Sequence, residues 1–273
     1  MRAKPEDMDV QPVGDLLSAW RKRRRLSQFE LASEAGISTR HLSFLETGRA
    51  LPSREMLLRL AEQLNVPLRE RNVLLVAAGL APAFPERPLD ALALRAAREA
   101  VELVLHAQEP FPALALDRHW NVVASNRAVA PLLVGVDEAL LRPPLNVLRL
   151  SLHPQGLAPR IENLWEWRAH LLERLRRQIE LTADPVLSEL LDEVRRFPKG
   201  DEPVRRSSAS RDYAGVVVPL ELRTEVGVLT LWSTTTVFGT PVDITLSELV
   251  LESFFPADEE TSEALRRMVS VAR

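Results

Sequence analysis

The sequence contains no cysteine and a single tyrosine, and only 5% of its 273 residues are aromatic. Without cysteine the chain has no disulfide, no thiolate metal site and no cysteine nucleophile, which fits a reducing compartment and predicts a cytoplasmic location. No run of 18 or more apolar residues is present, so we expect no transmembrane helix and no membrane partner. The opening residues MRAKPEDMDVQP carry acidic side chains where a signal peptide needs an apolar core, so export is not expected.

The motifs of common enzyme classes are also missing. The sequence has no Gly-x-Ser-x-Gly elbow, no phosphate-binding glycine loop and no glycine-rich dinucleotide fingerprint. Its five histidines are scattered, and no pair has metal-ligand spacing on one helix face. We therefore expect no catalytic residue, no metal and no cofactor. The five histidines are His41, His106, His119, His153 and His170.

Length and charge indicate two domains of different character. A chain of 273 residues with 46% hydrophobic residues is long enough to bury two cores. The net charge of -3 divides unevenly at Leu80, with 13 Lys and Arg against 10 Asp and Glu before it and 22 against 28 after it. The N-terminal part is therefore basic, as expected of a part that binds nucleic acid. We predict domains at residues 13–80 and 89–273, joined by a proline-containing linker at 81–88.

The segment from Ser27 to Gly48, SQFELASEAGISTRHLSFLETG, predicts a helix-turn-helix. Ser27 and Glu30 have capping-box spacing, so a helix begins at Gln28, and Gly36 makes the turn. Ser38 is expected to cap a second helix from Thr39 to Glu46, which buries Leu42 and Leu45. A surface helical hairpin without any partner is the alternative interpretation of this segment alone.

The exposed face of the second helix carries side chains suited to base recognition. Arg40 is able to donate two hydrogen bonds to a guanine, and Phe44 either touches a thymine methyl or packs under the next turn. The residues expected to contact bases are Thr39, Arg40, His41, Ser43 and Phe44. Cations near the groove and a helix N-terminus suit phosphates. The residues expected to contact phosphates are Lys22, Arg25, Gln28 and Arg49.

Residues Gly14 to Gly79 supply five helical segments, and they resemble the Xre-type DNA-binding domain shared with lambdoid phage repressors. The residues that carry the resemblance are Leu26-Ser27-Gln28, Glu30-Leu31-Ala32, Gly36-Ile37-Ser38 and Leu45-Glu46-Thr47-Gly48-Arg49. The resemblance implies an all-α, five-helix, lambda-repressor-like domain with base contacts on the second helix of the motif. Because one such helix reads only a few base pairs, we expect a homodimer on a double-stranded operator with two half-sites.

The C-terminal part has an α+β pattern. Residues 112–116 and 121–124 are predicted to form a hairpin, and three strands are predicted at 215–222, 226–238 and 242–255, the last with a bulge near Ser247. Helices are predicted at 89–108, 146–153, 163–181, 185–197 and 261–271. Together these elements predict an antiparallel sheet of about five strands with helices on one side.

This layout is PAS-like, and particular stretches resemble the MmyB-like ligand-binding domain that follows an Xre-type head in many bacterial regulators. The stretches are FPALALDRHWNVVASNRAVAPL, Leu152-His153-Pro154 and NLWEWRAHLLERLRRQ. The resemblance spans roughly residues 89–256. It implies a PAS-fold pocket that holds a fatty acid.

Arg168 stands out in this part, because helical projection places it near the centre of an apolar stripe on the helix at 163–181. A charge there needs a partner, which is either an internal carboxylate or the carboxylate of a ligand. Tryptophans 120, 165 and 232 are likewise either ordinary core residues or part of the pocket. The residues expected to bind the ligand are Trp120, Leu164, Trp165, Arg168, Leu171, Leu172, Leu175 and Trp232.

The sequence therefore predicts a bacterial transcriptional regulator, without enzymatic activity, whose N-terminal domain binds an operator. Its C-terminal domain is expected to sense a small apolar ligand such as a fatty acid. The competing hypothesis gives the C-terminal domain a fully packed core that serves only for dimerisation, with no effector.

Overall fold

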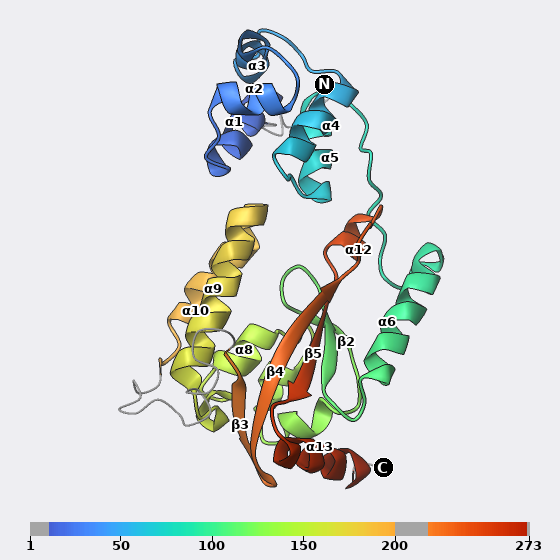
Figure 1. Ribbon diagram of the computed structural model, residues 1–273, viewed down its shortest axis with the longest axis vertical. Coiled ribbons are helices and arrows are strands. Elements are labelled where there is room, and N and C mark those ends of the chain that lie inside the picture. The colour runs from blue at the N-terminus through green and yellow to red at the C-terminus, as the bar shows by residue number, and fades with distance from the viewer. Residues whose placement is uncertain (1–10, 200–217, 272–273) are drawn as a thin grey trace, which may run out of the picture. The chain divides into compact units, whose positions relative to one another are not determined.

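The structure, a computed structural model, describes residues 11–199 and 218–271. It divides into two compact units whose main boundary in the sequence falls between Glu86 and Arg87 (Figure 1). The first part of the strand expected at 215–222 lies outside the described residues. None of the described helices is long and apolar enough to cross a membrane.

The N-terminal unit contains the five helices expected from the sequence. They are α1 (Val13–Arg23), α2 (Gln28–Glu34), α3 (Thr39–Glu46), α4 (Arg54–Gln63) and α5 (Leu68–Ala77). Serine side chains fix where three of them begin, because an N-cap oxygen accepts a backbone N–H that has no partner within the helix. Ser27 forms the predicted capping box with Glu30, Ser38 caps α3 and Ser53 caps α4. Leucines from all five helices form one buried core, so the all-α prediction is confirmed.

The C-terminal unit is built on one antiparallel sheet of five strands. The strands are β1 (Ala113–Leu116), β2 (Val122–Ser125), β3 (Leu220–Thr224), β4 (Gly227–Val237) and β5 (Val250–Pro256), in the order β2-β1-β5-β4-β3. The predicted hairpin is β1–β2, and the predicted meander is β3–β4–β5. Pairing of β1 with β5 joins the two into one sheet, which confirms the α+β prediction.

Helices cover both faces of this sheet, and not one face as the sequence suggested. The larger core lies between one face and α8 (Val147–Leu152), α9 (Leu164–Thr182) and α10 (Pro185–Arg195). A smaller core packs α6 (Arg95–Ala107) on the opposite face, where Val101 and Leu105 meet Ala113 and Ala115 of β1. Side chains alternate along β1, so Leu114 and Leu116 face the larger core while Ala113 and Ala115 face α6. All four β1 residues are therefore buried.

Two element boundaries also differ from the sequence prediction. Instead of one bulged strand over 242–255, the chain forms a short helix, α12 (Ile244–Ser247), followed by β5. The change of apolar parity at Ser247 therefore marks a switch of element. The helix expected at 89–108 is a 3-10 turn at Leu92–Leu94 followed by α6. The last helix is α13 (Glu259–Val271), close to the bounds expected from the sequence.

Candidate nucleic-acid interface and ligand pocket

Local features of the chain set the position of α3. Gly36 has a φ of +66°, a left-handed conformation that favours glycine, and it turns the chain between α2 and α3. Leu42 and Leu45 are fully buried, whereas Thr39, Arg40 and His41 are exposed. The exposed face thus holds three of the five side chains that the sequence assigned to base contacts, and the other two, Ser43 and Phe44, are half-buried.

Gly14 permits close packing of α1 on α3. A Cβ atom at this position would lie 2.6 Å from the carbonyl oxygen of Leu45 and 2.5 Å from that of Glu46. These contacts are with backbone atoms, so any larger residue would push the end of α3 away from α1. The sequence pattern did not identify Gly14 as a positioning residue, because its constraint comes from a helix more than thirty residues away in the chain.

A buried ion pair ties α1, α2 and α3 together. The Arg21 guanidinium donates to both carboxylate oxygens of Glu46, at 2.6 and 2.9 Å, and Gln28 Nε2 donates to Glu46 Oε2 at 2.8 Å. Burial alone would raise the pKa of Glu46, but the hydrogen bonds from Arg21 and Gln28 hold that pKa below its ordinary value. Glu46 is therefore a charged anchor on the buried side of α3, at the end of that helix.

 Because Gln28 bonds to the Glu46 carboxylate in the structure, its contact with a phosphate stays a prediction.

The basic run from Arg21 to Arg25 is divided between internal and exposed roles. Arg21 is buried against Glu46, and Arg24 donates to the carbonyl oxygens of Leu64 and Asn65 at 2.7 and 3.0 Å, beyond the end of α4. Lys22 and Arg25 are exposed. Both side chains are therefore accessible to phosphates, and their contact with phosphates stays a prediction.

Phe44 lies on α3 between two cations. The guanidinium of Arg40 lies 5.3 Å from the centre of the Phe44 ring, and that of Arg49 lies 5.8 Å from it. The ring is half-buried. Cation–π contacts of this kind limit the motion of both arginine side chains. Arg40, Phe44 and Arg49 thus form one exposed basic surface beside Thr39 and His41.

We expect Arg40→Ala and Lys22→Ala to affect DNA binding differently. If Arg40 reads a base, its loss should relax specificity at one operator position and cost about 1–3 kcal/mol of binding free energy. If Lys22 contacts a phosphate, its loss should weaken binding to all sequences and make the salt slope shallower by about one unit. Fluorescence anisotropy on operator and random DNA over a salt series measures both, with Arg59→Ala on α4 as control. Equal losses on both DNAs for Arg40→Ala would contradict the base contact.

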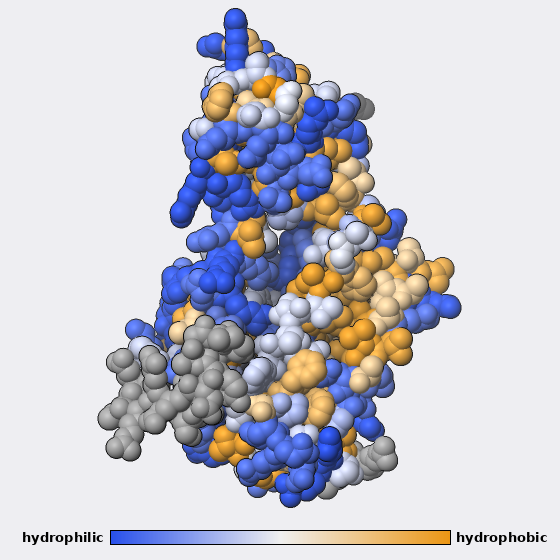
Figure 2. All heavy atoms as spheres, in the orientation of Figure 1, coloured by the Kyte–Doolittle hydropathy of each residue, from blue (hydrophilic) through white to orange (hydrophobic). Residues whose placement is uncertain are grey.

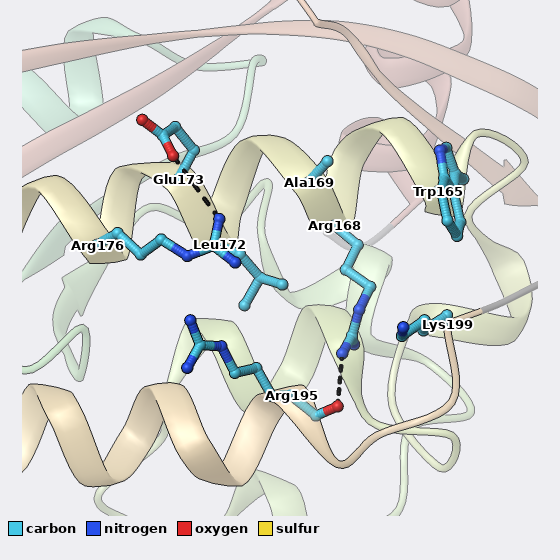
Figure 3. A pocket seen from close by; sticks show the side chains of 8 residues that line it. All are labelled: Trp165, Arg168, Ala169, Leu172, Glu173, Arg176, Arg195 and Lys199. Carbon is cyan, nitrogen blue, oxygen red and sulfur yellow. Dashed lines mark hydrogen bonds and ion pairs between the residues drawn. The ribbon is translucent and has the colours of Figure 1, made fainter.

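The C-terminal unit has a pocket between α9 and the end of α10. Its volume is about 610 Å³, and its lining joins three apolar side chains, Trp165, Ala169 and Leu172, to a set of charged ones. Figure 3 shows Arg168 extending from α9 toward the chain that leaves α10, with Lys199 nearby. The full lining is Trp165, Arg168, Ala169, Leu172, Glu173, Arg176, Arg195 and Lys199.

Within its own chain Arg168 bonds to backbone carbonyls, and not to an internal carboxylate, which was one of the two partners expected from the sequence. Its Nη2 donates to the carbonyl oxygens of Val194 and Arg195, at 2.9 and 3.1 Å. These carbonyls end α10, where the helix dipole favours a cation. Burial lowers the pKa of Arg168, yet a guanidinium stays protonated in proteins. Its other terminal nitrogen, Nη1, is buried and has no hydrogen-bond partner among residues 11–199 and 218–271.

The charge around Arg168 is predominantly positive. The lining contains one carboxylate, that of Glu173, and four cations, which are Arg168, Arg176, Arg195 and Lys199. Glu173 pairs with Arg176 at 3.7 Å and also accepts from Arg177 at 3.0 Å, both on its own helix. The pocket is thus suited to an anionic group, because its cations outnumber its carboxylates.

The structure brings three of the eight predicted ligand residues to this pocket, namely Trp165, Arg168 and Leu172. Leu171 and Leu175 lie in the larger core, and Leu164 packs against it. Trp120 is also in that core, where its Nε1 donates to Gln178 Oε1 at 2.7 Å. Trp232 has the strand parity opposite to Leu229 and Leu231, which face the larger core, so its side chain is on the other face of β4.

Sequence reasoning missed the contribution of α10 to the pocket. Arg195 and Lys199 belong to a short basic run, RRFPK, which was visible in the sequence but had no periodicity that linked it to α9. Within the described part of the chain, no group of three or more histidine, aspartate or glutamate residues is arranged to hold a metal ion.

Two known proteins are similar to parts of this chain. A protein of Methanoculleus marisnigri described as an HTH-type transcriptional regulatory protein is 38% identical over 127 residues, which is 45% of this chain and 40% of that protein. The ImmF control region 10 kDa protein of Bacillus phage phi105 is 39% identical over 61 residues, which is 22% of this chain and 68% of the phage protein. The chain thus spans about two fifths of the length of the Methanoculleus protein.

Family models match both units. A helix-turn-helix model matches residues 17–71, and the model of the MmyB-like transcription regulator ligand binding domain matches residues 97–268, more than half of the chain. The first match contains α2 and α3, and the second contains the pocket around Arg168. The chain therefore belongs to the MmyB-like transcription regulators, with a DNA-binding helix-turn-helix domain followed by a ligand-binding domain.

Proposed function

We propose that this regulator binds a two-fold symmetric operator as a homodimer and that a fatty acid in the Arg168 pocket changes its affinity for that operator. In this proposal the exposed face of α3 contacts base edges, and Lys22, Arg25 and Arg49 contact phosphates. In this proposal the protein acts in the cytoplasm, needs no cofactor and catalyses no reaction.

The observation that carries the ligand proposal is the unpartnered Nη1 of Arg168. A buried donor without an acceptor costs about 1–3 kcal/mol, and more where the group is charged. The residue Arg168 is only 5% exposed, and it lines a pocket. A ligand carboxylate that accepted from Nη1 would remove this cost and would gain a charge-assisted hydrogen bond.

The remaining lining favours an anion that carries an apolar tail. Trp165 is 38% exposed and Leu172 and Ala169 lie beside it, so an alkyl chain would cover apolar surface. The cations Arg176, Arg195 and Lys199 favour a negative head group over a neutral one. Each buried methylene should contribute roughly 0.8 kcal/mol, so affinity should rise with chain length until the pocket is full. A volume of about 610 Å³ is within the usual range for small-molecule sites.

We expect Arg168→Met to weaken binding of dodecanoic acid by about 10- to 100-fold and binding of dodecanol by much less. Only the acid loses a charged partner, worth about 1.5–3 kcal/mol. Isothermal titration calorimetry on the full chain measures the affinity for both ligands, each kept below its aggregation concentration. Arg177→Met is the matched control, because Arg177 is on the same helix and pairs with Glu173 but does not line the pocket.

The same variants separate the ligand role from a structural one. Loss of the two bonds to Val194 and Arg195 should lower the melting temperature of the ligand-free protein, so Arg168→Lys, which keeps the charge, is measured as well. An unchanged preference for acid over alcohol in Arg168→Met would contradict the proposal. Failure of the unmodified protein to bind either ligand would favour a C-terminal domain that serves only for dimerisation.

A further inference from the structure

The Arg168 pocket carries more positive charge than one carboxylate neutralises. Its lining contains four cations and one carboxylate, an excess of three positive charges. Two of these groups also pair outside the lining, where Glu173 accepts from Arg177 at 3.0 Å and Arg195 pairs with Asp192 at 3.4 Å. Arg177 and Asp192 have opposite charges, so including them leaves the excess at three. A ligand with a single negative charge would therefore leave two of these positive charges without compensation.

The cations of the pocket come from two separate segments. Arg168 and Arg176 are about two turns apart on α9, whereas Arg195 is the last residue of α10 and Lys199 follows it. Figure 3 shows Arg176 and Arg195 extending from the two helices toward the space between them. Cations on both sides favour a head group that presents oxygen atoms in several directions. A carboxylate has two oxygens in one plane, but a phosphate monoester has three acceptor oxygens and nearly two negative charges at neutral pH.

One of the four cations is held in place and three are exposed. The bonds to the carbonyls of Val194 and Arg195 fix Arg168, whose Nη1 has no hydrogen-bond partner in the described part of the chain. Arg176, Arg195 and Lys199 are exposed, so their side chains have room to turn toward a bound head group. Arginine often binds phosphate through two parallel hydrogen bonds. Arg168 would therefore position the head group, and the exposed cations would neutralise its second charge.

The apolar part of the lining suits an alkyl chain attached to such a head group. Trp165, Ala169 and Leu172 supply this part, while the face seen in Figure 2 is mainly hydrophilic (blue) over the part of α9 at the left of Figure 1. We propose that the pocket binds a phosphate monoester of an alkyl chain more tightly than it binds a fatty acid of the same length. The inference rests on the proposed function, because it concerns the head group of the ligand in the same pocket.

Titration calorimetry of the full chain at neutral pH tests the head group with dodecyl phosphate, dodecyl sulfate and dodecanoic acid, each below its aggregation concentration. Dodecyl sulfate has a tetrahedral head group but a single charge. We expect dodecyl phosphate to bind at least about tenfold more tightly than either of the others, because it alone gains a second charged contact. Its affinity should also fall more steeply with added salt, since three of the cations are exposed. Equal or weaker binding of dodecyl phosphate would overturn the inference.

Arg195→Met tests whether the extra cations act in the pocket. This variant removes one exposed positive charge but keeps the Arg195 carbonyl that accepts from Arg168, so the ligand-free protein should keep its melting temperature. Dodecyl phosphate should bind roughly tenfold more weakly and dodecanoic acid less so, which narrows the preference. Arg177→Met removes the same charge from α9 outside the lining and should keep the preference. Equal narrowing in both variants would be an effect of net charge and would overturn the assignment.

Two further comparisons separate this inference from its alternatives. Inorganic phosphate should bind much more weakly than dodecyl phosphate, because it lacks the alkyl chain, and equal affinity would mean a site for free phosphate and overturn the inference. Binding of dodecanoic acid that depends on Arg168, without any preference for dodecyl phosphate, would overturn the inference and leave the proposed function intact. Tight binding of dodecyl phosphate without any change in operator affinity would support the inference and contradict the proposed function.

Discussion

Arg21→Ala is expected to lower the free energy of unfolding of the N-terminal unit by about 3–5 kcal/mol. The substitution removes the partner of a buried carboxylate, and an uncompensated buried charge is costly. Arg21 gives Glu46 two hydrogen bonds, and the Glu46 side chain is only 5% exposed. Hydrogen exchange of the α1 and α3 amides in the full chain measures the change in the unit itself, because it reports opening of those helices.

Two further variants distinguish loss of the ion pair from loss of packing. Arg21→Met/Glu46→Leu removes both charges and should recover most of the stability, because a buried ion pair often exchanges for apolar residues at little cost. Arg59→Ala removes an exposed arginine that pairs with Glu55 on α4 and should cost less than about 1 kcal/mol. A loss for Arg21→Ala no larger than that for Arg59→Ala would contradict the anchor role of the pair.

The same pair makes stability depend on pH. The pKa of Glu46 is lower in the folded protein than its ordinary value, so the folded state binds the proton less readily than the unfolded state does. The stabilisation is therefore complete above the unfolded pKa, about 4.3, and is lost as the pH falls through the folded pKa. Glu46→Gln should flatten this acid limb of the stability curve.

The helix-turn-helix was predictable from the sequence because its signals are local. The capping box at Ser27, the cap at Ser38 and the turn at Gly36 each involve residues a few positions apart. The roles of Gly14 and Arg21 were not predictable in this way. Both depend on the end of α3, which approaches α1 only after the unit has folded.

In the C-terminal unit, too, local patterns were predictable from the sequence and contacts between distant elements were not. Alternation and helical periodicity predicted the five strands and the long helix α9, but they do not state which face of a sheet a helix covers. The position of α6 on the second face followed only from the pairing of β1 with β5 at the centre of the sheet. Projection identified Arg168 as unusual, yet its acceptors are carbonyls at the end of α10, which no side-chain pattern reveals.

The second large expected effect is the response of operator binding to ligand. If occupation of the Arg168 pocket and binding of α3 to DNA are coupled, saturating dodecanoic acid should change operator affinity by about 5- to 150-fold, the usual range of allosteric coupling. By reciprocity, operator DNA should change the affinity for the acid by the same factor. Arg168→Met should lose most of this response, whereas Arg177→Met should keep it.

The most direct measurement is therefore an anisotropy titration of the full chain with an operator selected from random DNA, with and without dodecanoic acid. The account predicts a change of at least about fivefold in the operator dissociation constant for the unmodified protein, and little change for Arg168→Met or with dodecanol. Equal operator affinity with and without saturating acid in the unmodified protein would contradict it.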